Sequence, residues 1–120
     1  MSVVLQLEWR VMASLVTEPA LRFIFDAIEL EDFTDFRCRV WFKAFRALQA
    51  AGEHVDALAI LDRVEATDAQ LDLHAAENAN GAYLAHVLLA TQPYKFPSLA
   101  LFDAGLLHTY AQRRALQVAA

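Results

Sequence analysis

The sequence has few residues that break or cross-link a chain: three glycines, three prolines and one cysteine occur in 120 positions. So few glycines exclude the glycine-rich loops that cradle phosphates, and neither G-x-x-x-x-G-K-[ST] nor G-x-G-x-x-G is present. Cys38 alone cannot form an internal disulfide, and the N-terminus lacks the charged segment and cleavage site of a signal peptide. We therefore expect a cytoplasmic protein without a bound nucleotide cofactor.

Positive charge is also scarce. Lys and Arg number 10 against 15 Asp and Glu, which gives a net charge of -5. Nucleic-acid affinity comes largely from cations that neutralise phosphates, so we expect no direct binding of duplex DNA. No uncharged apolar run reaches the length of about 18 residues needed to span a membrane. The apolar residues, 58% of the chain, are therefore expected in a core or a protein interface.

Apolar residues recur at spacings of three and four through most of the chain, and alanine and leucine are abundant. This pattern predicts an all-α fold, a single compact bundle of about six helices over residues 1–120. Trp9, Phe33, Trp41 and Phe45 are expected to share one core. The expected helices cover 4–16, 19–30, a span from 31–35 to Gly52, 56–66, a segment around 83–88, and the chain from 98, with 67–81 as a short helix or ordered loop.

Residues with reactive chemistry are scattered. His74 and Glu77 stand three apart, but the repeated Glu-x-x-His of a di-metal bundle is missing. Cys38 lies between Arg37 and Arg39, which would lower a thiol pKa, yet no histidine is near in sequence, so a half-buried structural cysteine is favoured. Asp56, Asp62 and Glu65 are explained as a helix cap and an exposed face. We predict no catalytic, cofactor-binding or metal-binding residues; an enzyme would require a cluster of titratable groups with shifted pKa values.

Basic residues concentrate in one segment. Arg39, Lys43 and Arg46 fall on one helix face at spacings of four and three, which makes this a candidate partner face. The alternative is a solvated stripe, opposite the Trp41 and Phe45 side, that pairs in part with Glu31, Asp32 and Asp35. The alternative is favoured on the sequence alone.

Large apolar residues crowd around two prolines near the C-terminus. Contiguous exposed apolar patches usually mark protein contacts, so we expect self-association here, as a two-fold dimer. In the competing arrangement, Tyr94 and Phe96 fold back to close the core. The candidate interface comprises Tyr94, Phe96, Leu99, Phe102, Leu106 and Tyr110.

Five segments follow a recognisable order. Residues 7–16 (LEWRVMASLV) fit A-E-x-x-L-L-G-x-L-L, residues 28–48 (IELEDFTDFRCRVWFKAFRAL) fit L-x-x-E-D-F-Y-x-x-x-H-R-x-I-F-x-A-I-x-x-L, and residues 52–64 (GEHVDALAILDRV) fit G-x-x-V-D-x-x-T-(I/V)-x-x-x-L. Residues 81–84 (GAYL) and 110–114 (YAQRR) look like G-x-x-Y-L and Y-A-x-(I/V)-V-R, each with one residue fewer than the pattern. In this order the segments resemble the N-terminal domain of the DnaB-type replicative DNA helicases.

The sequence departs from this pattern at several positions. Cys38 stands where the family has His, Thr34 where it has Tyr, and Ala59 where it has Thr. Residues 91–101 replace the family's T-P-S-A-A-N-I linker with a longer stretch that holds two prolines and two aromatics. These changes bear on the C-terminal geometry and the choice of partner more than on the fold.

The resemblance implies a non-catalytic interaction and oligomerisation domain. In the family this domain forms a collar on the ring helicase, pairs with neighbouring copies and engages primase or a helicase loader during DNA replication. The family's ATPase motor is not part of this sequence. The chain is therefore expected to be either an N-terminal piece of a helicase or a stand-alone regulator or helicase-binding module, of which the helicase-binding domain at the primase C-terminus is a variant.

Overall fold

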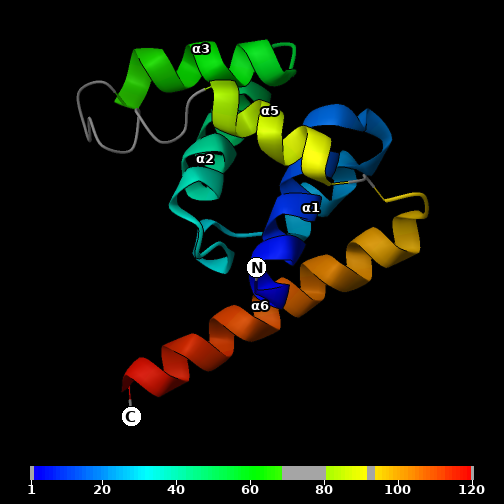
Figure 1. Ribbon diagram of the computed structural model, residues 1–120, viewed down its shortest axis with the longest axis vertical. Coiled ribbons are helices and arrows are strands. Elements are labelled where there is room, and N and C mark those ends of the chain that lie inside the picture. The colour runs from blue at the N-terminus through cyan, green and yellow to red at the C-terminus, as the bar shows by residue number, and fades with distance from the viewer. Residues whose placement is uncertain (1, 69–80, 92–93, 120) are drawn as a thin grey trace.

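All regular secondary structure in the described residues, 2–68, 81–91 and 94–119 of a computed structural model, is helical (Figure 1). The all-α prediction is therefore confirmed. The segments are α1 (Val3–Thr17), η1 (Pro19–Ala27), η2 (Leu30–Asp32), α2 (Phe36–Ala50), α3 (Ala57–Asp68), α5 (Gly81–Ala90) and α6 (Pro97–Ala119), where η denotes a 3-10 helix. None of the helices in this part of the chain has both the length and the apolar character needed to cross a membrane.

Helix α1 is central, and α2, α5, α6 and η1 all pack against it. The Ser2 hydroxyl caps its start by accepting a hydrogen bond from the Leu5 N–H at 3.0 Å. Every residue from Val11 to Val16 is buried, so this helix is enclosed on most of its circumference. Its extent and its wide buried face agree with the sequence prediction.

The next segment differs from the α-helix predicted over 19–30. Residues 19–27 form the 3-10 helix η1, and a separate turn, η2, begins at Leu30. A local cause of the break is a capping box, in which the side chains of Glu29 and Asp32 each accept from the other residue's backbone N–H and so start a new turn. Leu21 and Ile24, spaced by three, are buried, which suits the tighter 3-10 period.

Helix α2 begins at Phe36, later than the acidic residues that the prediction placed in its first turn. Asp35 is instead its N-cap, accepting from the Arg37 N–H at 3.0 Å. The helix ends as predicted before Gly52, whose φ of 69° lies in the left-handed region that favours glycine. After the buried Val55, the predicted cap of α3 is confirmed: Asp56 Oδ1 accepts from the Ala59 N–H at 2.8 Å.

One cluster of buried side chains joins these helices. Trp9, Phe33, Trp41 and Phe45 all belong to it, as predicted, with exposed fractions of 5% or less. The Phe42 ring belongs to the same cluster, with its centroid 5.1 Å from that of Phe33 and 6.3 Å from that of Phe45. Such aromatic pairs add stabilisation beyond the area that they bury.

Helix α6 crosses one side of the body and projects beyond it toward the C-terminus (Figure 1). It packs on α1, η1 and η2 through Ala100, Ala104 and Leu107, each of which is fully buried. The expected helix around 83–88 is found as α5. The loop or helix expected over 67–81 lies mostly outside the described residues.

Candidate functional site

A buried carboxylate joins α1 to the start of α2. Glu8 Oε1 accepts hydrogen bonds from the backbone N–H groups of Thr34, at 2.6 Å, and Asp35, at 2.8 Å. The Thr34 hydroxyl donates to Oε2 of the same carboxylate. On the same side, the Trp9 indole N–H donates to Asp35 Oδ2 at 2.8 Å. The two acidic side chains therefore fasten α1 to the N-terminus of α2.

Burial raises the pKa of the Glu8 carboxyl above its ordinary value, although the hydrogen bonds from Thr34 and Asp35 act in the opposite direction. Raised carboxyl pKa values also occur in catalytic acids. The hydrogen bonds of Glu8, however, go to the backbone and a hydroxyl of this fold's own turn. We therefore assign Glu8 to the positioning of helices.

A second buried carboxylate attaches α6 to the body. Asp32 Oδ2 accepts from the Glu29 N–H at 2.9 Å, and Oδ1 lies 3.0 Å from Nδ1 of His108. Further along α6, Arg114 donates to the Glu31 carbonyl at 3.3 Å. The hydrogen bond and the charge of Asp32 raise the pKa of His108. Neither His108 nor Arg114 was predicted in this role, since nothing in their local sequence points to η2.

Cys38 is wholly buried, with Sγ 3.8 Å from Asp35 Oδ2. Burial, followed by the negative charges of Asp35 and Glu8, raises the pKa of the Cys38 thiol well above its ordinary value. Arg37 lowers the pKa, but by less, and its guanidinium pairs with Asp35 at 3.2 Å. The structure thus confirms a structural cysteine, more deeply buried than the half-buried position predicted.

The candidate acid/base residues are spread along α3. Asp56 caps the helix and lies 3.2 Å from the exposed His54 ring, while Asp62 is exposed. Among the described residues, no three His, Cys, Asp or Glu side chains lie where they could hold a metal ion together. Three candidates fall outside the described side chains: Glu65, His74 and Glu77.

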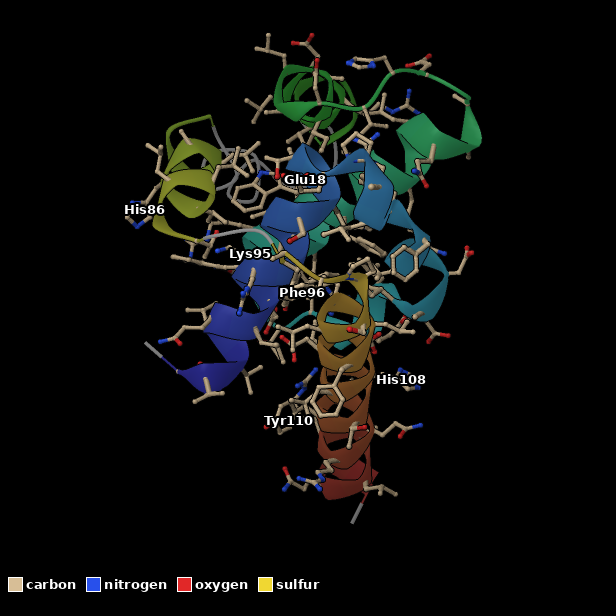
Figure 2. All side chains as sticks on the ribbon, turned by 90° about the vertical axis from the view of Figure 1, so that its right-hand side faces the viewer. Glu18, His86, Lys95, Phe96, His108 and Tyr110 are labelled. Atoms are coloured by element: carbon tan, nitrogen blue, oxygen red, sulfur yellow. The ribbon has the colours of Figure 1, made fainter. Side chains whose placement is uncertain are left out.

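The candidate interface residues mostly line one exposed side of α6. Phe96 and Phe102 are 66% and 67% exposed, Leu99 is 41% exposed, and Leu106 and Tyr110 are partly exposed. Figure 2 shows Phe96 and Tyr110 on the same side of this helix. We call these five residues the α6 stripe.

Tyr94 does not belong to this exposed set. Its ring is buried, its hydroxyl donates to Asp103 at 2.7 Å, and its backbone N–H donates to Ser14 Oγ at 3.3 Å. The Arg10 guanidinium lies 4.3 Å from the ring centroid, a cation–π contact. Tyr94 therefore folds back on α1, as in the competing arrangement, whereas Phe96 remains outside.

The basic residues of α2 share one solvent-facing side. Lys43 and Arg46 are exposed, and Arg39 is partly exposed. Two of the carboxylates expected to pair with them are bonded elsewhere, Asp32 to His108 and Asp35 to Trp9 and Arg37. The expected pairing is therefore found for Asp35, which pairs with Arg37 of the same basic segment, whereas Asp32 is bonded to His108.

Comparison with known proteins gives one family. The sequence model described as DnaB-like helicase N terminal domain matches residues 2–94 of the 120-residue chain. No curated protein and no solved structure matches significantly. The matched range contains Glu8, Asp32 and Asp35 and ends at Tyr94, so the α6 stripe lies beyond it.

Proposed function

The chain belongs to the family of DnaB-like helicase N-terminal domains, and we propose that it acts as a non-catalytic oligomerisation and interaction domain that self-associates through the α6 stripe. The family match supports an oligomerising helicase domain in general. A two-fold dimer, and contacts with neighbouring helicase subunits and with primase or a helicase loader, are the specific parts of the proposal.

The observation that carries the proposal is that α6 has two apolar sides. One side, formed by Ala100, Ala104 and Leu107, is buried against the body. The other presents the α6 stripe, whose larger side chains remain in water. A helix that serves only the core of its own chain needs one apolar face, so the second calls for a partner.

The spacing of the α6 stripe suits a partner helix. Leu99, Phe102, Leu106 and Tyr110 follow one another at three, four and four residues, which keeps them in one row along α6. Such rows interlock with a similar row on a facing helix. If two α6 helices pack against each other about a two-fold axis, both rows are buried in one contact. No exposed row is then left to bind a third copy, so the assembly stops at a dimer.

Sedimentation of a double variant tests the interface. Changing Phe102 and Leu106 to Lys places two charges in the row and is expected to convert a dimer to a folded monomer. The matched control changes Leu58 and Leu89, which are 72% and 89% exposed on α3 and α5, to Lys. A wild-type chain that is monomeric at high micromolar concentration, or an equal effect of the control, contradicts the proposal.

Titration of the labelled chain with purified primase and, separately, a purified helicase loader tests the partner contacts. We expect saturable binding of at least one of them. Absence of binding to both, by a chain whose helical circular dichroism is intact, would remove these partners from the proposal without affecting self-association.

A further inference from the structure

We propose that the exposed side of α2 formed by Phe36, Arg39, Lys43 and Arg46, here called the α2 basic face, binds an acidic helical segment of a partner protein. Charge is distributed unevenly in this molecule. Helix α2 holds four of the ten Lys and Arg residues and none of the 15 Asp and Glu residues. A positive helix in a chain of net charge -5 marks a local preference for anions.

The α2 basic face is a continuous row. With a period of 3.6 residues, positions 36, 39, 43 and 46 fall on one side of the helix, and the opposite side is the core face that contains Trp41 and Phe45. Phe36, at the start of the row, is 47% exposed. Ala50 continues the row and is exposed, and its own side chain is too small to hinder an opposing helix.

Two of the three cations are already held in position. The Arg46 guanidinium lies 5.6 Å from the Phe42 ring centroid, and Arg39 Nη1 approaches the Phe33 carbonyl at 3.5 Å. Guanidinium groups that are ordered before binding lose less conformational freedom when they meet a carboxylate. Because a guanidinium carries five donors, the contact of Arg39 with Phe33 leaves it able to bind a carboxylate as well.

The spacing favours a peptide over a nucleic acid. Arg39 to Arg46 spans about 10 Å along the helix axis, the same distance as carboxylates at positions i, i+4 and i+7 of a partner helix. An apolar residue one turn further would meet Phe36. Three cations on a chain of net negative charge neutralise too few phosphates for tight nucleic-acid binding. The α2 basic face does not depend on self-association through α6.

The test uses a fluorescent helical peptide with Glu at spacings of four and three and a Leu one turn beyond, titrated at low and physiological salt. We expect saturable, salt-dependent binding that Lys43→Glu weakens about tenfold. The matched control is Lys95→Glu, the same charge change at another exposed lysine, and it should leave binding within about twofold of wild type. Phe36→Ala should weaken binding of this peptide but not of a second peptide in which Ala replaces the Leu.

Four results would overturn the proposal. The first is that the peptide does not bind the wild-type chain at low salt, and the second is that Lys95→Glu weakens peptide binding as much as Lys43→Glu does. The third is that oligothymidylate binds more tightly than the peptide and competes with it for the same residues. The fourth is that Lys43→Glu changes the oligomeric state of the chain. Competition by oligothymidylate would make the α2 basic face a nucleic-acid site, and a changed oligomeric state would make it a contact between copies of the chain. Lys43 is exposed, so its substitution is compatible with folding, and circular dichroism of each variant checks this.

Discussion

Substitution of Glu8 tests how the domain is held together. Replacement by Ala removes the acceptor for the Thr34 and Asp35 N–H groups and leaves space in a buried site. A buried donor without a partner costs about 1–3 kcal/mol, and since Thr34 is exposed and the turn is only partly buried, we expect a loss of about 2–4 kcal/mol in unfolding free energy. Replacement by Gln retains an oxygen for both N–H groups and offers an N–H to the Thr34 hydroxyl, so its cost should stay below about 1 kcal/mol.

The raised pKa of Glu8 adds a pH dependence of known sign. Because burial favours the protonated carboxyl in the folded state, wild type loses stability as the pH rises above the ordinary carboxyl value of 4.5. The Gln variant has no ionisable group at this position and lacks this loss, so its unfolding free energy should rise relative to that of wild type between pH 4 and pH 7. Urea unfolding at both pH values measures the difference. A Glu8→Ala cost below about 1 kcal/mol, or a Gln variant as unstable as the Ala variant, would refute the reasoning.

Four further substitutions have expected outcomes in thermal or urea unfolding. Trp41→Ala should cost about 3–5 kcal/mol because the ring is fully buried, and a loss below about 1 kcal/mol would contradict this. Gly52→Ala should lower the unfolding free energy by about 1 kcal/mol because Gly52 has a positive φ. Gly105→Ala, with open space around its Cβ position, should instead stabilise α6 by about 0.5–1 kcal/mol. Changes in unfolding free energy of the same sign for both variants would contradict the argument. His108→Gln should lower stability most below pH 6.5, where the raised pKa keeps the imidazole charged beside Asp32, and the difference from wild type should shrink as the pH rises further; a constant difference would show that the charge contributes nothing.

Elements that depend on local signals could be predicted from the sequence. The Asp56 cap, the Gly52 stop and the extents of α1 and α3 follow from side chains within a few residues of each boundary. The aromatic core also followed from periodicity, because apolar residues at helical spacing form one face, and on α2 that face packs inward.

Elements that depend on distant partners could not be predicted. The 3-10 form of η1 is accompanied by Arg22, whose guanidinium donates to the carbonyls of Leu15, at 3.0 Å, and Val55, at 2.9 Å. The pairing of His108 with Asp32 joins positions 76 residues apart. One signal was present in the sequence: Glu8 lies between Leu7 and Trp9 in a largely apolar helix, and a carboxylate buried there requires hydrogen-bond donors from elsewhere in the fold.

The motif in residues 28–48 separates fold from partner choice. Its fixed positions include Asp32, Phe33, Trp41 and Phe42, all buried. Phe36, Lys43 and Arg46 occupy positions that the motif leaves open, and they point to solvent. A substitution at a fixed position is therefore constrained by packing, whereas one at an open position changes the charge and shape of the surface at little cost in stability. Arg39 is the one residue of the α2 basic face at a fixed position, so relatives that share this fold can differ at Phe36, Lys43 and Arg46. These three positions are where partner specificity can diverge while the domain itself is preserved.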